Sequence, residues 1–242
     1  MRTYLDCYPC FLRQALSAAR RVGADENAQV AIVGETLDLL HGLDPGQSPP
    51  EIGYAVHRIV RERLSQRDPY RATKVRSTCE ALALYPRLKA LVSESADPVA
   101  TAVRLSIAGN IIDFAQSDEL ADLWVTVERV LAAPLAADDL DAFRTSLATA
   151  SAVLFLADNA GETVFDRVLI EVLPVPVIYA VKGGPILNDA TLEDATAAGL
   201  DLCATLIDNG ADAPGTILPL CSEEFRQAFA IAPLVIAKGG HS

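Results

Sequence analysis

The chain has 242 residues, of which 51% are hydrophobic, and a formal net charge of −12 at pH 7. This length and composition predict a folded protein with a sizeable core, arranged as one large domain or two modest ones. The acidic charge argues against nucleic acid and anionic membranes as partners, and no apolar run reaches the roughly 18 residues that span a bilayer. Because the N-terminus also lacks the layout of a signal peptide, we expect a cytoplasmic protein.

Residues 1–150 are predicted to form an all-helical region with short turns. Apolar residues recur at helical spacing, and Gly23 and Gly42 are placed to end the first two helices. The region shows no alternating strand pattern. The expected helices cover residues 11–22, 25–41, 48–64, 72–84, 87–93, 98–108, 117–132 and 138–149.

Cysteine and histidine usage gives weaker signals. Five cysteines form no even disulfide framework, and only Cys7 and Cys10 are paired by spacing. A single C-x-x-C supplies two of the four ligands that structural zinc needs, so packing, metal binding and redox chemistry all remain open for this pair. The three histidines share no ligand spacing, which disfavours a zinc-histidine site.

Residues 151–242 change to a rhythm of strand, helix and strand. Apolar segments predict strands at 152–157, 175–181, 202–207 and 234–237, with helices between them at 163–173 and 191–198 and another beginning at Ser222. Such alternation predicts a parallel sheet covered by helices. The sequence therefore predicts a helical N-terminal region followed by an α/β region.

Polar residues follow each predicted strand. Because parallel strands end at one edge of the sheet, these residues are expected to converge. Carboxylate and amide oxygens suit Mg²⁺ or Mn²⁺, whereas lysines and glycine-loop N–H groups suit phosphate. A metal beside a phosphate cradle is typical of phosphoryl chemistry. The residues are Asp158, Asn159, Lys182, Asp189, Asp208, Asn209 and Lys238.

The charge distribution supports a cation at this edge. Residues 1–150 hold 16 Lys and Arg against 20 Asp and Glu, whereas residues 151–242 hold 4 against 12, an excess of 12 − 4 = 8 acids. An acidic site that accepts an anion needs a cation to reconcile them.

Structural interpretations of the same residues stay open. Asn159 with Glu162 resembles a capping box, Asp189 could cap the helix that begins near Thr191, and Asp208 begins an ordinary turn signal. Asn110 and Asp113 lie one helical turn apart, so they could form a structural hydrogen-bonded pair or reach the site from the helical region.

The order of motifs resembles the family long labelled "domain of unknown function 89", the metal-dependent damage-control phosphatases, and in particular its microbial branch with an N-terminal C-x-x-C. The resemblance covers nearly the whole chain. The segments that carry it are Cys7-x-x-Cys10, Asp68-Pro69-Tyr70, Gly109-Asn110-x-x-Asp113, Asp158-Asn159-Ala160-Gly161-Glu162, Lys182-x-x-Pro185-x-x-Asn188-Asp189 and Ala237-Lys238-Gly239.

The resemblance implies an α/β fold in which the helical N-terminal region packs on a three-layer α/β/α core with a mainly parallel sheet. It also implies that Asp158, Asn159 and Asp189 are catalytic and bind a divalent ion, whether Mn²⁺, Mg²⁺, Co²⁺ or Ni²⁺. Lys238 would contact the phosphate of the substrate. The full substrate-binding set would be Asn110, Asp113, Glu162, Lys182 and Lys238.

The function expected from the resemblance is metal-dependent hydrolysis of phosphate monoesters of small metabolites, such as sugar phosphates or damaged phosphorylated metabolites. The spacing leaves open whether Asp158 or a water attacks phosphorus. The family usually continues Lys-Gly-x-Gly-Asn and then several dozen residues, whereas this chain ends soon after Lys238. A non-catalytic member that binds a metal or phosphometabolite is therefore the alternative. A Rossmann enzyme is disfavoured because G-x-G-x-x-G is missing.

Overall fold

A four-stranded parallel sheet forms the centre of the molecule. The computed structural model describes residues 3–44, 46–64, 68–111 and 120–239. Its strands run in the order β3-β2-β1-β4, and every adjacent pair is parallel, as predicted. The strands are β1 (Val153–Leu156), β2 (Val177–Val181), β3 (Thr205–Asp208) and β4 (Val235–Ala237).

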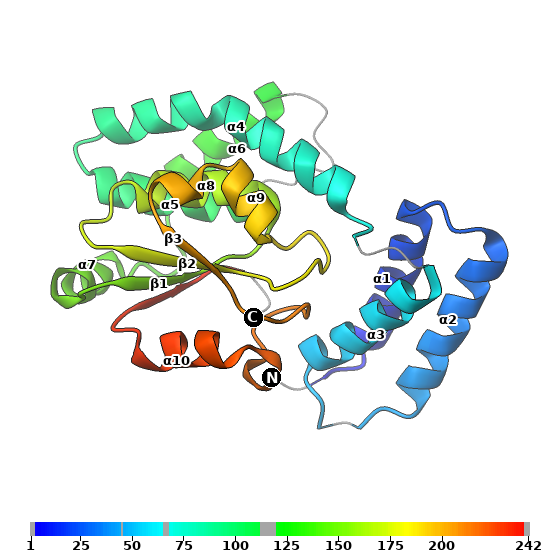
Figure 1. Ribbon diagram of the computed structural model, residues 1–242. Helices are drawn as coiled ribbons and strands as arrows, with labels where there is room; N and C mark the ends of the chain where they lie inside the picture. The colour runs from blue at the N-terminus through cyan, green and yellow to red at the C-terminus, as the bar shows by residue number, and fades with distance from the viewer. Residues whose placement is uncertain (1–2, 45, 65–67, 112–119, 240–242) are drawn as a thin grey trace.

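Helices cover both faces of this sheet. Alternate residues of a strand point to opposite faces, so Phe155 and Tyr179 enter one core while Leu154 and Ala180 enter another. The ring centroids of Phe155 and Tyr179 lie 5.2 Å apart. The first core lies under α4 (Arg71–Glu94), α5 (Pro98–Ile111) and α8 (Thr163–Ile170), and the second under α10 (Glu223–Ile231). Figure 1 shows these three layers, so the predicted α/β architecture is confirmed.

The remaining helices fall into two groups. Buried residues of α6 (Leu120–Ala132) and α7 (Leu140–Thr149), such as Val127 and Leu147, join the core of the sheet, and Ala195 of the short helix α9 (Leu192–Ala197) does the same. By contrast α1 (Cys7–Arg21), α2 (Glu26–His41) and α3 (Pro49–Leu64) form a core of their own around Phe11 and Ile32. Figure 1 shows these three helices to one side of the sheet, and we call them the three-helix lobe.

One predicted helix break is wrong. The sequence predicted separate helices at 72–84 and 87–93, whereas α4 runs unbroken through Pro86. Proline in a helix interior removes one hydrogen bond and costs about 3 kcal/mol. Leu84 and Leu88 are both buried in the core of the sheet, so packing on either side of Pro86 holds the helix together.

Two other observations bear on the expectations above. Within the described part of the chain, none of the helices combines the length and the apolar character that a bilayer crossing requires. Cys7 and Cys10 both lie in α1, partly buried and with free thiols, so the C-x-x-C is the first turn of a helix.

Candidate active site

The ends of the strands meet as the sequence predicted, and backbone hydrogen bonds carry the alignment past the strands. The Lys238 N–H donates to the Leu156 carbonyl at 3.0 Å, and the Ala157 N–H donates to the Ala180 carbonyl at 2.9 Å. The loop after β2 then turns back, and Asn159 and Asp189 form an antiparallel bridge. This bridge brings Asp189 beside the end of β1, although 30 residues separate the two in sequence.

Asn110 reaches the same place from α5. A Cβ at Gly109 would lie 3.0 Å from the Phe165 side chain, so glycine permits the close packing of α5 on α8 that brings Asn110 to the end of β1. The Asn110 Nδ2 lies 3.2 Å from an Asp158 oxygen and 2.9 Å from the Glu162 Oε1.

Asn159 makes the same pair of contacts. Its Nδ2 lies 3.1 Å from the Asp158 Oδ2 and 2.7 Å from the Glu162 Oε1. An ionised carboxylate can only accept hydrogen bonds, so the NH₂ end of each amide must face the two acids. The Oδ1 atoms of Asn110 and Asn159 are therefore turned away from Asp158 and Glu162.

Two lysines lie among these acids. The Lys182 ammonium is 3.4 Å from the Asp189 carboxylate and donates to the Gly215 carbonyl. The Lys238 ammonium is 3.0 Å from the Glu162 Oε2, and 10% of its side chain is exposed. Both predicted lysines are thus held by protein acceptors at the site.

Burial and crowding of acids perturb the titration of the site. Burial, followed by the charges of Glu162 and Asp189, raises the pKa of Asp158 to about 7. Burial likewise raises the pKa of Asp189 to about 6, although Lys182 opposes the shift. Burial alone would lower the pKa of Lys238, but the neighbouring carboxylates outweigh it and the pKa is raised. The site therefore disfavours its own negative charge.

The donor set fits a hard divalent ion. Among the described residues no group of three or more His, Cys, Asp or Glu side chains has an arrangement that could hold a metal. The available donors are instead the carboxylates of Asp158 and Asp189 with the Oδ1 of Asn159, an oxygen set suited to Mg²⁺ or Mn²⁺. A cation here would stabilise the ionised form of both buried carboxyl groups, whose pKa values burial raises.

The structural interpretations can now be separated. Thr191, with Asp194 as its capping-box partner, caps α9, so Asp189 is not the cap. The Asn159 side chain donates to acids rather than capping the turn that follows it. By contrast Asp208 accepts from the Gly210 N–H at 2.8 Å, the contact expected of an ordinary turn.

The structure thus groups most of the predicted site. Asp113 lies outside the described residues, and the roles of all these residues remain predictions. Sequence reasoning missed Ser106, Asp166 and Tyr179, which lie behind Lys238. One signal was readable, because Asp158, Glu162 and Asp166 are spaced by four residues. The residues that the structure brings together are Asn110, Asp158, Asn159, Glu162, Lys182, Asp189 and Lys238.

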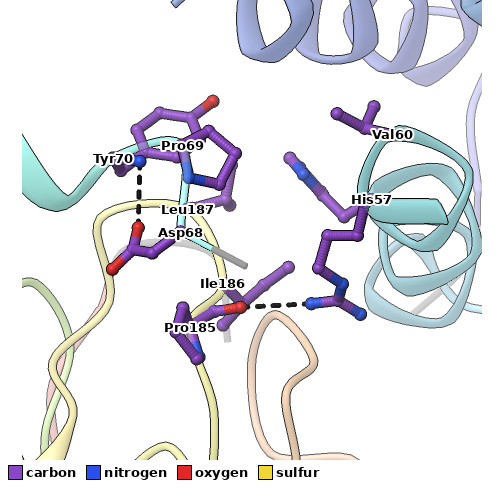
Figure 2. Close-up of a pocket in the computed structure, with 9 residues that line it drawn as sticks. His57, Val60, Asp68, Pro69, Tyr70, Pro185, Ile186 and Leu187 are labelled. Carbon is purple, nitrogen blue, oxygen red and sulfur yellow. Dashed lines mark hydrogen bonds between the residues drawn. The ribbon is translucent and has the colours of Figure 1, made fainter. Parts of the chain in front are cut away.

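A separate cavity lies where the three-helix lobe meets the loop after β2. Figure 2 shows the His57 imidazole extending from α3 toward Pro69 and Leu187. Arg61 donates to the Pro185 carbonyl at 3.1 Å across the same junction. At about 10 Å³ the cavity has room for one water-sized molecule, too little for a phosphate ester.

A second pocket lies at the strand ends themselves. It is lined by Lys182 and Asn209 beside Leu156, Ala157 and Thr216. This pocket is equally small, at about 10 Å³, and Lys182 is the member of the acid and lysine group that lines it. Pocket size does not separate the two places, but the acids, amides and lysines converge at this edge of the sheet, so we take the edge as the candidate active site.

Comparisons with known proteins identify the family of the chain. Residues 3–240 match the family model described as the damage-control phosphatase ARMT1-like domain. The chain is 34% identical to an uncharacterized protein of Methanocaldococcus jannaschii over 97% of its own length and 80% of that protein. It is 33% identical to a protein named damage-control phosphatase of Archaeoglobus fulgidus, over 96% and 83% of the two chains.

A solved structure extends the comparison to the fold. The crystal structure of a DUF89 family protein from Pyrococcus horikoshii superposes with a TM-score of 0.90 at 30% identity. The alignment covers 99% of this chain and 85% of that one. The arrangement of helices and sheet described above is therefore the arrangement found in that protein.

Proposed function

The chain belongs to the damage-control phosphatase ARMT1-like family, and on this premise we propose that it is a divalent-metal-dependent phosphatase. Its substrates would be phosphate monoesters of small metabolites, such as sugar phosphates or damaged phosphorylated metabolites. The phosphatase names of its relatives support the reaction type. The arrangement of acids, amides and lysines at one sheet edge supports the metal and the phosphate.

The observation that carries the proposal is the orientation of the Asn159 amide. Its NH₂ group is used by Asp158 and Glu162, so its Oδ1 takes no part in these contacts and is available as a cation ligand. Asp158 and Asp189 would supply the carboxylate oxygens. A bound divalent ion would supply Lewis-acid stabilisation of charge on a phosphoryl oxygen. The phosphate of the ester would then lie against the ion held by these three residues.

The two lysines complete the electrostatics. Lys182 and Lys238 place positive charge beside an otherwise acidic edge, which favours an anionic ester. The glycine-loop N–H groups contribute less than the sequence suggested. The N–H of Gly183 donates to Ala211 and Asn209, and the N–H of Gly210 donates to Asp208.

The direct test is hydrolysis of an aryl phosphate by metal-stripped protein, with Mg²⁺, Mn²⁺, Co²⁺ and Ni²⁺ added back singly. We expect turnover that depends on one of these ions and falls more than about 100-fold in Asp158→Ala. Asp208→Ala is the matched control, because Asp208 also ends a strand but serves a turn. Metal-independent turnover, or full activity of Asp158→Ala, would refute the proposal.

A folded protein that binds the ion without turnover would favour the alternative, a non-catalytic member that binds phosphometabolites. Inorganic phosphate is then the probe to use, because it reports anion binding without requiring hydrolysis. Metal-dependent phosphate binding that is lost in Asp158→Ala, without hydrolysis of the aryl phosphate, would support this non-catalytic alternative.

A further inference from the structure

Behind the candidate site lies a polar group that the proposed reaction does not use. Asp166 of α8 is fully buried, and both of its carboxylate oxygens accept hydrogen bonds. The Ser106 hydroxyl donates to its Oδ1 at 2.8 Å, and the Tyr179 hydroxyl donates to its Oδ2 at 2.8 Å. These side chains come from α5, α8 and β2, so the group ties three elements together.

This group holds the Lys238 ammonium. Lys238 donates to the Ser106 carbonyl at 2.5 Å and to its hydroxyl at 3.2 Å, and it lies 3.3 Å from the Asp166 carboxylate. The Ser106 hydroxyl thus accepts from Lys238 and donates its one hydrogen to Asp166, so it has no donor left for another group. The lysine is therefore fixed from behind, on the side away from the sheet edge.

The same ammonium fixes Glu162. Lys238 lies 3.0 Å from the Glu162 Oε2, while the Oε1 of that carboxylate accepts from both Asn110 and Asn159. Glu162 is 2% exposed, so its carboxylate is enclosed by these donors. A buried carboxylate would also repel a phosphate, so Glu162 is better suited to orient the amides than to contact the ester.

We propose that Ser106, Asp166 and Tyr179, here called the lysine seat, are positioning residues for the reaction. The seat holds Lys238, Lys238 holds Glu162, and Glu162 turns the two amide oxygens toward the metal position. Partners of this kind behind metal ligands commonly affect metal affinity about 10- to 100-fold. The effects on metal binding and on hydrolysis rest on the proposed function, whereas the effect on the two amides does not.

The test removes both hydroxyls that donate to Asp166, in the double variant Ser106→Ala/Tyr179→Phe. This change leaves the charge of the site unaltered, so a change in metal affinity reports position rather than attraction. The matched control is Ser77→Ala/Tyr85→Phe. There the Ser77 hydroxyl bonds its own helix at 2.9 Å, and the Tyr85 hydroxyl bonds Glu171 at 2.6 Å, away from the seat.

Two measurements are made on each full-length variant. The first is the Mn²⁺ dissociation constant from the electron paramagnetic resonance of free Mn²⁺. The second is the side-chain amide NMR signals of Asn110 and Asn159 in metal-free protein. We expect the seat variant to bind Mn²⁺ about 10-fold more weakly and to shift both amide signals, while the control changes neither. Melting temperature, measured in parallel, should fall in both variants.

Equal Mn²⁺ affinity in the two variants, with unshifted amide signals, would overturn the proposal and leave the seat a packing feature. If the double variant does not fold, Ser106→Ala alone against Ser77→Ala decides by the same readouts. Failure of the proposed function is distinguishable, because wild-type protein would then bind Mn²⁺ without hydrolysing an aryl phosphate. If wild-type protein binds no Mn²⁺, the amide signals of metal-free protein still decide the role of the seat.

Discussion

The two ends of α8 carry charge clusters of opposite character. At its C-terminal end, Glu171 accepts from the Tyr85 hydroxyl at 2.6 Å and from Arg167 at 2.9 Å, and Lys89 lies 2.8 Å away. We call this the Glu171 cluster. Burial would raise the pKa of Glu171, but these donors outweigh it and the pKa is lowered. One acid here faces two cations and a hydroxyl, and we call this excess of cations over acids a saturated arrangement.

At the N-terminal end of α8 the balance is reversed. Four acids share two lysines at close range, and burial raises the pKa of Asp158, Asp166 and Asp189. We call this the site cluster. Buried acids with raised pKa values are common at functional sites, where a ligand can neutralise them. From this contrast we expect the unsaturated cluster to be the functional one. The site cluster consists of Asp158, Glu162, Lys182, Asp166, Asp189 and Lys238.

The largest expected effect comes from removing the cation that the site cluster depends on. Lys238→Met keeps most of the side-chain volume but leaves Glu162 and Asp166 without their ammonium. Breaking a buried ion pair in this way costs about 3–5 kcal/mol of unfolding free energy. Urea unfolding at pH 7 measures this loss. A loss below about 1 kcal/mol would mean that the acids rely on other partners.

The imidazole of His57 provides a third environment, in which a titratable group is buried and one of its nitrogens has no hydrogen-bond partner among the described residues. His57 is 4% exposed, its Nε2 finds no hydrogen-bond partner among the described residues, and burial followed by the charge of Arg61 lowers its pKa to about 4. Asp68 and Tyr70 also line its cavity. In the unfolded chain its pKa is about 6.5.

The direction in which folding stability changes with pH follows from which state binds the proton. Between pH 6.5 and 4 the unfolded state binds the proton and the folded state does not, so stability falls as pH falls through this window. The difference between a pKa of about 6.5 in the unfolded chain and about 4 in the folded protein corresponds to about 3 kcal/mol of unfolding free energy. Urea unfolding from pH 7 to 4 should show a flatter profile in His57→Leu than in the control His41→Gln, whose histidine is exposed. Parallel profiles in the two variants would contradict the buried neutral state.

The comparison of the clusters is sharpened by equivalent neutralising substitutions. In metal-free protein at pH 8, Asp158→Asn should raise the unfolding free energy by about 1–2 kcal/mol, because it relieves repulsion from Glu162 and Asp189. Glu171→Gln should lower it by about 1–3 kcal/mol, because it weakens hydrogen bonds to charged donors. Changes of the same sign, measured by urea unfolding, would mean that the two clusters do not differ as described.

Metal addition provides the companion measurement. Mn²⁺ at about 100 times its dissociation constant should stabilise wild-type protein by about 2.7 kcal/mol. Asp158→Asn lacks one proposed ligand and should gain much less at the same concentration. Glu171→Gln should gain as much as wild type, because its cluster lies at the other end of α8.

The site edge could be predicted from sequence because it depends on a local rule. Apolar strands ending at Asp158, Lys182 and Lys238 place these residues together once the sheet is parallel. Pro86 was misread because burial of its neighbours in α4 is a tertiary effect that local propensity does not contain.

The lysine seat lay beyond this rule. Ser106 and Asp166 are 60 residues apart, and Tyr179 sits in a strand whose other residues are apolar. Each looks like an ordinary helix or strand residue in isolation. Only the close packing of α5 on α8, permitted by Gly109, brings the first two together.

The smallest expected effect comes from the saturated cluster. Lys89→Met removes one of the donors to Glu171, but Arg167 and Tyr85 remain, and the Lys89 side chain is 53% exposed. Exposed ion pairs contribute about 0.2–1 kcal/mol, so we expect a loss of about 0.5 kcal/mol that shrinks in 0.5 M salt. Urea unfolding at two salt concentrations measures both. A loss comparable to that of Lys238→Met would show that the Glu171 cluster is not saturated, and that the difference between the two ends of α8 lies elsewhere.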